Sequence, residues 1–478
     1  MLLSEKLNLN KSQYELDFVD IDLYGDIPLF INSNLIRNYD LEHRMKMADT
    51  MDSFFTFLLN ALVNDLDDIA KDLCLHLSEI NETHLGLSRG KSQGKGVGPK
   101  NAIKIFKYLK ESDAIKKGVL ENIEDLRLFI KKFDKDMLSD MITNILKKQL
   151  LDYTIEQCNL LNIQLTPNIP SGYYWDNENY KWTQKYMDRL VIEGKPIVLI
   201  PKRIVNYSDD YTSQKYKQHF VLNFLQEDNI KNQTSLVQLR KDETPYVTKK
   251  DIIVYEPKMD KNYLVNFTLK HSEVLKDFKK ENLKNAKVMD GNIISEISIE
   301  SIVKILLEKL ANIKAGKKHA QEFHDLMIGI FEFLLYPKLT NPTKELRIYN
   351  GRKRIDICFS NIAENGFFGN YVPEKLKLPC PLLIVECKNY NEDVKNPELD
   401  QLAGRFSTKR GRLGLISCRE IEDERLFLDR CADTYTADNG LIIPITDKDI
   451  IRCLKKEADC FEEFENILHE KSQIIVSN

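Results

Sequence analysis

The sequence predicts a multidomain α/β protein, and three observations support this class. The chain has 478 residues, enough for about three domains of roughly 150 residues each. Hydrophobic residues make up 42% and charged residues 30%, a composition typical of globular proteins. The residue pattern also changes twice along the chain. We therefore expect a mainly helical N-terminal domain over 1–165, a mixed α+β middle domain for recognition or regulation over 166–290, and an α/β C-terminal domain over 291–478.

Charge and hydropathy narrow the possible classes of function. The 69 basic and 73 acidic residues give a net charge of −4, so nucleic-acid binding would have to come from a local basic patch. No apolar run approaches the roughly 18 to 20 residues of a membrane span, and the polar start MLLSEKLNLNKSQ does not resemble a signal peptide. Nine cysteines without a CxxC pair predict reduced, buried thiols and no zinc site. We expect a cytoplasmic protein without membrane contact.

Apolar residues recur at helical spacing from Leu41 to about Asn162, which predicts several helices. The basic, glycine-rich stretch GKSQGKGVGPK (90–100) fits no standard phosphate-loop pattern. It is interpreted as a flexible loop, with phosphate or nucleic-acid contact as the alternative. The later segment YTSQKYKQHF (211–220) is interpreted as an amphipathic helix, with base stacking on its tyrosines as the alternative.

The C-terminal domain has the most informative pattern. A helix is predicted over HAQEFHDLMIGIFEFLLYP (319–337), with Phe323, Met327, Ile330 and Leu334 on its buried stripe. The segment KELRIYNGRKRIDICF (344–359) predicts two strands joined by a turn at Asn350 and Gly351. A third strand is predicted over PLLIVECKNY (381–390).

Two of these strands carry charged residues in otherwise apolar surroundings. Asp356 lies within the second strand, and Glu386 and Lys388 lie on one face at the end of the third. Burying such charges requires compensation, and metal chemistry on phosphodiesters supplies it. We expect Asp356, Glu386 and the backbone carbonyl of Cys387 to hold Mg²⁺, with Mn²⁺ as a substitute. Lys388 would orient or activate the attacking water. The alternative for Glu386 and Lys388 is a structural salt bridge.

A further helix follows, with Asn396 as its N-cap and Pro397 in its first turn. Gln401 and Arg405 are four residues apart and share a face, which either positions Lys388 or is simply solvated. Basic residues collect here and beside Asp356. The residues expected to contact nucleic acid are Arg352, Lys353, Arg354, Arg405, Lys409 and Arg410.

These residues resemble the PD-(D/E)xK, or restriction-endonuclease-like, nuclease superfamily. Its pattern is an acidic residue on a first helix, Asp on the second strand, Glu-x-Lys on the third, and then a helix and a strand. Here the order is Glu322, Asp356, Glu386-Cys387-Lys388, the Gln401 helix and the strand GLISCR, within about 295–446. The pattern differs in having Ile355 before Asp356 in place of proline, and about 30 residues between Asp356 and Glu386.

The resemblance implies a mixed central sheet flanked by helices, with Asp356, Glu386, Lys388, Glu322 and Gln401 as catalytic residues. Glu322 has Glu332 and Glu345 as rivals and an ordinary exposed carboxylate as its alternative, and His319 and His324 are expected on the surface. The function implied is a Mg²⁺-dependent DNA endonuclease of bacterial restriction or anti-phage defence, with RNA as an alternative substrate, acting as a homo-oligomer or as a subunit of a defence complex. The alternatives are a repair or recombination nuclease on branched or single-stranded DNA, and a catalytically inactive nuclease fold that binds nucleic acid or supports assembly.

Overall fold

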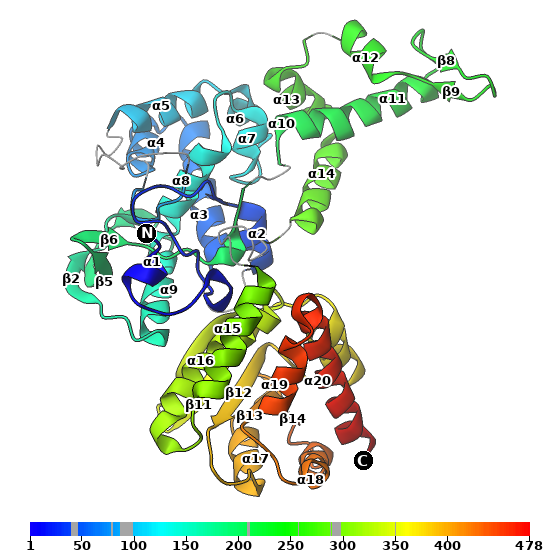
Figure 1. The fold of residues 1–478 in the computed structure, drawn as a ribbon. Coiled ribbons are helices and arrows are strands. Elements are labelled where there is room, and N and C mark those ends of the chain that lie inside the picture. Colours follow the sequence, from blue (N-terminus) through cyan, green and yellow to red (C-terminus); the bar gives the residue numbers. More distant parts are fainter. Residues whose placement is uncertain are drawn as a thin grey trace.

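The structure is a computed structural model that describes residues 1–39, 46–77, 80–86, 99–207, 211–256, 258–286, 288, 298–348 and 350–478. Figure 1 shows an N-terminal body, an arm that projects from it, and a C-terminal α/β part that contains the largest sheet. The chain is therefore mixed α/β, as expected. None of the described helices combines the length and the apolar character that crossing a membrane requires.

The N-terminal body is mainly helical, as predicted. Helix α3 buries the stripe Met51, Phe54, Phe55, Leu58 and Leu62. Residues 90–98 of the glycine-rich stretch lie outside the described residues, and α5 follows them. The elements are α1 Leu3–Lys6, β1 Phe30–Ile31, α2 Ser33–Tyr39, α3 Met47–Val63, α4 Asp67–Cys74, α5 Pro99–Lys110, α6 Asp113–Lys116, α7 Asp125–Phe129, α8 Lys135–Ile145 and α9 Lys147–Leu160.

Short antiparallel strands pack on this body. Strands β2, β5 and β6 form one sheet in that order, β3 pairs with β4, and β7 pairs with β1. One continuous group of buried side chains runs from Leu3 to Phe278, across the predicted boundary at 165. The domain limits themselves stay a prediction. The strands are β2 Thr166–Pro170, β3 Tyr174–Asp176, β4 Lys181–Thr183, β5 Tyr186–Ile192, β6 Lys195–Ile197 and β7 Val205–Asn206.

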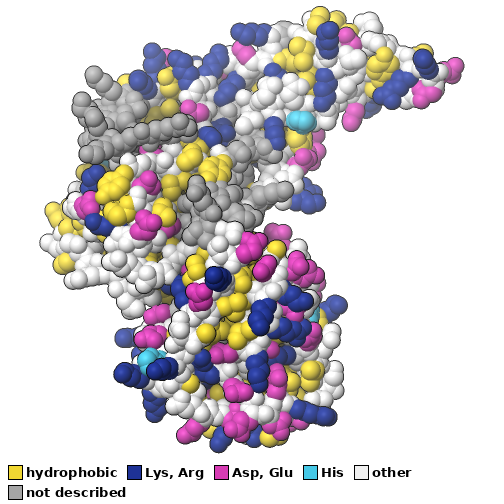
Figure 2. All heavy atoms as spheres, in the orientation of Figure 1, with side chains coloured by type: hydrophobic (Ala, Val, Ile, Leu, Met, Phe, Trp, Pro, Cys, Tyr) yellow, Lys and Arg dark blue, Asp and Glu magenta, His cyan; other side chains and the backbone are white. Residues whose placement is uncertain are grey.

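The arm begins with the segment YTSQKYKQHF. Tyr211 and Tyr216 are buried, and the Tyr211 hydroxyl donates to Asp125 Oδ1 at 2.6 Å, so neither ring is available for stacking on bases. The segment is mostly helical, as favoured from the sequence. Figure 2 shows Lys and Arg side chains along the arm among acidic and hydrophobic ones. The elements are α10 Ser213–Lys215, a π-helix Tyr216–Val221, α11 Leu222–Lys231, β8 Gln238–Leu239, β9 Pro245–Tyr246, α12 Lys249–Tyr255, α13 Lys261–Lys270 and α14 Ser272–Asn285.

The C-terminal part is built on a five-stranded sheet of order β10-β11-β12-β13-β14. The first three strands are antiparallel, and β12, β13 and β14 are parallel. Every residue of β13 and β14 is buried, because helices cover both faces. The elements are α15 Ile299–Asn312, α16 Ala320–Leu335, β10 Leu339–Ile348, β11 Lys353–Asn361, a π-helix Phe367–Lys375, β12 Leu382–Lys388, α17 Asn396–Ala403, β13 Leu413–Cys418, α18 Glu424–Thr436, β14 Leu441–Thr446, α19 Asp447–Leu454 and α20 Cys460–Ser477.

The cysteines and the predicted stripe of α16 behave as expected. All nine cysteines are buried free thiols, seven of them in the C-terminal part. The four α16 stripe residues predicted from the sequence are buried, and together with apolar residues of the sheet they belong to the second large core.

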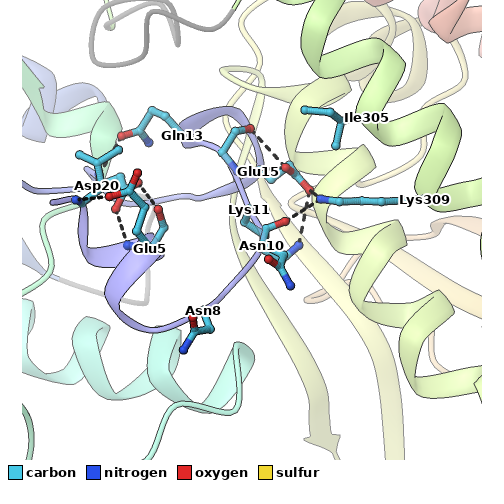
Figure 3. A pocket seen from close by; sticks show the side chains of 12 residues that line it. Glu5, Asn8, Asn10, Lys11, Gln13, Glu15, Asp20, Ile305 and Lys309 are labelled. Carbon is cyan, nitrogen blue, oxygen red and sulfur yellow. Dashed lines mark hydrogen bonds and ion pairs between the residues drawn. The ribbon is translucent and has the colours of Figure 1, made fainter.

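A polar joint fastens the N-terminal body to α15 and α16. Lys202 lies 2.9 Å from the carboxylate of Glu332 on α16, and both side chains are almost fully buried. Asp17 accepts from the Tyr153 hydroxyl at 2.7 Å and from the Asn341 N–H at 3.0 Å. Figure 3 shows the neighbouring cleft of about 310 Å³, where Lys309 of α15 reaches the N-terminal segment. This joint links the two parts through buried polar groups, beside apolar contacts such as that between Tyr14 and Phe333.

The joint predicts a specific pH dependence of stability. Burial raises the pKa of Glu332 to about 7; the Lys202 charge opposes the shift and the Asp17 charge adds to it. An unfolded glutamate loses its proton near pH 4.3, about three units lower. The stabilisation from protonated Glu332 is therefore full below about pH 4 and is lost as pH rises through about 7.

We expect Glu332→Gln, which stays neutral, to flatten the decline of Tm between pH 4.5 and 7.5. Lys202→Met is the contrasting variant: it removes the buried ammonium that faces Glu332 and Asp17, and it should lower the free energy of unfolding by about 3–5 kcal/mol. Wild-type and Glu332→Gln curves that fall in parallel would contradict this assignment of the proton.

Candidate active site

Strands β11 and β12 bring Asp356 and Glu386 to one end of the sheet. Ile357 pairs with Val385 and Cys358 with Ile384, so the same register continued places Asp356 opposite Glu386, on one face. The backbone N–H of Cys387 donates to Asp356 Oδ2 at 3.1 Å. The structure therefore brings together the two carboxylates that the sequence singles out.

Glu386 is the most buried charged group of the site, with a side chain only 1% exposed. Its Oε1 accepts from Lys388 Nζ at 3.1 Å and from Gln401 Nε2. Lys388 Nζ also donates to Gln401 Oε1, at 3.2 Å. Within the described ranges, the second oxygen of Glu386, Oε2, is buried and has no hydrogen-bond partner. A buried carboxylate oxygen without a donor is costly unless something else binds it.

Gln401 reaches this site because α17 packs closely on the sheet. Gly414 on β13 lies beneath the helix, and a Cβ there would come within 2.8 Å of Phe406 and 2.9 Å of Leu402. The absence of a side chain at Gly414 therefore sets the height of α17 above the strands. The helix begins at Asn396, one residue before the predicted start, so its cap residue is Lys395, whose N–H donates to the Glu398 carboxylate at 2.9 Å.

The charges of the site shift one another's protonation. Burial raises the pKa of Glu386, the Asp356 charge raises it further, and Lys388 and Arg405 oppose the shift. Burial alone would lower the pKa of Lys388, but the charge and hydrogen bond of Glu386 outweigh it, and the pKa of Lys388 is raised. Lys388 is therefore an ammonium at neutral pH, which makes it a hydrogen-bond donor and a counter-charge, and not a base.

Helix α16 contributes a histidine, His324, that was expected on the surface. His324 Nε2 lies 3.3 Å from the carbonyl oxygen of Cys387 and 3.7 Å from Asp356 Oδ2, and the side chain is 19% exposed. The prediction of a surface residue is therefore wrong for His324. His324 stands three and four residues before the buried Met327 and Ile328, a helical spacing that indicates the inward margin of α16.

The acidic residues proposed for the first helix do not reach the site. Glu322 is 63% exposed, and its carboxylate lies 3.1 Å from His319 Nδ1. Glu322 and His324 are two residues apart, so their side chains leave the helix in different directions. Of its rivals, Glu332 belongs to the joint with Lys202, and Glu345 pairs with Arg354 at 3.1 Å. On α16, His324 takes the position near Asp356 that the sequence assigned to Glu322.

The basic residues predicted to contact nucleic acid fall into two groups, one beside the end of β12 and one in the turn that lies against its start. Arg352, Lys353 and Arg354 are exposed at the start of β11, and Lys353 Nζ donates to the carbonyl of Gly404 just after α17 at 3.2 Å. Lys409 is exposed, and Arg410 Nε donates to the carbonyl of Arg405 at 2.9 Å. The contact with nucleic acid stays a prediction.

The oxygen atoms that could bind a hard cation here come from two side chains and one backbone carbonyl. In the part of the chain that the structure describes, no three His, Cys, Asp or Glu side chains gather closely enough to hold a metal ion by themselves. Asp356, Glu386 Oε2 and the Cys387 carbonyl instead offer an oxygen half-shell, of the kind that Mg²⁺ completes with water and substrate phosphate. The orphaned Oε2 fits this use.

Comparison with known proteins gives one match. Residues 8–213 match a family model described as "Domain of unknown function (DUF8370)". No curated protein and no solved structure matches the chain. The matched segment covers the N-terminal body and ends before α15, so it does not include the site around Glu386.

The close packing under α17 predicts a steric sensitivity at Gly414. Gly414→Ala would force a methyl group against Phe406 and Leu402, and such overpacking typically costs about 1–3 kcal/mol. We expect a lower Tm for this variant, measured by a thermal melt. Gly25→Ala is the matched control, because a Cβ at Gly25 has no atom within 4 Å. Equal melting of the two variants would contradict the account of how α17 is seated.

Proposed function

We propose that the chain is a metal-dependent nuclease that hydrolyses phosphodiester bonds, with DNA as its main substrate. The observation that carries the proposal is the buried carboxylate of Glu386. One of its oxygens is bound by Lys388 and Gln401, and the other has no donor among the residues that the structure describes. Asp356 stands opposite it on the neighbouring strand. Two carboxylates and a lysine in this relation suit the cleavage of a phosphodiester with a divalent cation.

The order of helices and strands in the C-terminal part also supports the proposed nuclease function. A helix, a β-hairpin, a third strand with Glu-Cys-Lys, a helix and a parallel strand follow one another from α16 to β13. This order resembles the PD-(D/E)xK superfamily. With no matching solved structure, the support rests on this order and on the chemistry of the site.

Each residue of the site has a separate role in the proposed reaction. Asp356, Glu386 and the Cys387 carbonyl would hold Mg²⁺, which when bound polarises the phosphate and acidifies a coordinated water. Lys388 donates hydrogen bonds toward the nucleophile and the scissile phosphate, as its charged state requires. Gln401 holds Lys388 and Glu386 together. His324 borders Asp356 and the Cys387 carbonyl, where it helps to place both oxygens.

We infer a role in bacterial restriction or anti-phage defence, in which the N-terminal body and the arm recognise a target or a signal. The arrangement of the chain supports this role. The site lies in the C-terminal part, while the N-terminal body and the arm that projects from it make up the remainder of the chain (Figure 1). The first alternative is a repair or recombination nuclease. A catalytically silent nuclease fold is the second, and cleavage assays separate it from the others.

The test of cleavage uses the purified full chain with modified and unmodified plasmid, linear duplex, single-stranded DNA and RNA, each with Mg²⁺ or with EDTA. We expect Mg²⁺-dependent cleavage that is lost in Asp356→Ala and Glu386→Gln. Glu322→Gln is the matched control, since its carboxylate faces solvent, and should keep activity. Nucleic acid bound but uncut by the wild-type chain under every condition would favour the silent fold; cleavage by both site variants would refute the site.

Lys388 should act on the rate more than on binding. Lys388→Met keeps the aliphatic stem and removes the donor, and a hydrogen-bond donor aimed at developing charge is typically worth about 10²- to 10³-fold in rate. We expect the single-turnover rate to fall by this order while the Kd for DNA changes only modestly. Because the change leaves Glu386 without its cation, a thermal melt must show that the variant is folded. A normal rate at saturating DNA, with weakened binding, would make Lys388 a phosphate anchor only.

A further inference from the structure

The segment between α15 and α16, residues 313–319, is fastened to the end of β12 directly beside Lys388. Asn389 Nδ2 donates to the carbonyl oxygens of Lys314 and Gly316, both at 3.0 Å. The N–H of Gly316 in turn donates to the Asn389 carbonyl at 2.8 Å. Asn389 is 2% exposed, so these hydrogen bonds are protected from water. We call residues 313–319 the lysine loop.

The turn of the lysine loop depends on glycine. Gly316 has a φ of +116°, a conformation that residues with a side chain rarely adopt. A Cβ there would also lie 3.3 Å from the Asn391 amide, on the segment that follows β12. The loop therefore has a definite place against the strand end, set by a buried amide and by one glycine.

The lysine loop presents cations that the protein itself does not neutralise. Lys314, Lys317 and Lys318 are exposed, and among the described residues none of them forms an ion pair. Other basic residues near the site are engaged: Lys344 lies 2.6 Å from Asp325, and Arg354 pairs with Glu345. Exposed lysines without ion-pair partners on one short loop create a local positive potential that attracts anions.

These charges lie at the same end of the sheet as the predicted basic residues at the start of β11, Arg352, Lys353 and Arg354. Continuing the register of β11 and β12 puts Lys353 level with Asn389, and Lys353 reaches toward the residue after α17. The lysine loop instead precedes α16, the helix that carries His324. The site thus has cations towards α17 and further cations towards α16.

We propose that the lysine loop is a docking surface for the phosphate backbone of the nucleic acid, and that Lys317 and Lys318 contact phosphates beyond the scissile one. This proposal rests on the proposed nuclease function. Asn389 is the positioning residue, because it ties the loop to the strand that carries Glu386 and Lys388. A duplex that crosses the strand ends would meet cations on both sides of the site, which fixes where its backbone passes.

The test measures binding and not cleavage. A fluorescein-labelled DNA duplex is titrated by anisotropy at several salt concentrations, in EDTA, with the full chain and with Lys317→Met/Lys318→Met. Each lost phosphate contact lowers the slope of log affinity against log salt by about 0.9, so the double variant should lose up to about 1.8. The matched control is Lys455→Met/Lys456→Met, which removes two exposed lysines after α19 and should keep the wild-type slope.

Failure of this proposal is distinguishable from failure of the proposed function. A reduced slope in the loop variant alone supports the docking surface, whether or not the wild-type chain cleaves. Equal slopes for the loop variant, the control variant and the wild type overturn the docking surface, even if Mg²⁺-dependent cleavage is observed. An equal loss in both double variants also overturns it, because the effect would then reflect net charge alone.

Discussion

The buried carboxylate of Glu386 is the constraint on which the rest of the candidate site depends. A negative charge at the end of a core strand must be compensated where it lies, and Lys388 and Gln401 do this for one of its oxygens. Gln401 can do so only if α17 packs close to the sheet, and this requires the bare backbone at Gly414. Among the described residues the other oxygen has no donor, which supports the proposed cation shared with Asp356.

Helix α16 connects this site to the N-terminal body. His324 near its start contacts the site, and Glu332 near its end is paired with Lys202 in the joint. The two residues are separated by eight positions, or about 12 Å along a helix. Because His324 and Glu332 lie on one continuous helix, the joint with the N-terminal body also constrains where His324 lies. This places the N-terminal body in physical contact with the helix that borders the candidate active site.

Local patterns predicted most of the C-terminal elements. Alternation and apolar runs indicated β11 and β12, and their charged ends indicated Asp356, Glu386 and Lys388, because side-chain direction in a strand follows from residue parity. The spacing on α17 also indicated Gln401, which lies within hydrogen-bond distance of Lys388 and Glu386; its catalytic role stays a prediction. The resemblance pointed to Glu322 on the first helix, but the structure places His324 beside Asp356 and leaves Glu322 exposed, since a two-residue difference on a helix changes the direction of the side chain. The joint and the hydrogen bonds of Asn389 connect residues that are far apart in the sequence. The periodicity of a short segment predicts only local structure, so it could not predict these contacts.

The cation at Glu386 can be tested by locating Mn²⁺ in a crystal of the full chain through its anomalous scattering, for the wild type and for Glu386→Gln. We expect one peak in the wild type, in contact with Asp356, Glu386 Oε2 and the carbonyl of Cys387, and no peak there in Glu386→Gln. A wild-type crystal grown with saturating Mn²⁺ that shows no ion at this position, with Lys388 still bound to Glu386, would contradict the account, because the pair would then be a structural salt bridge.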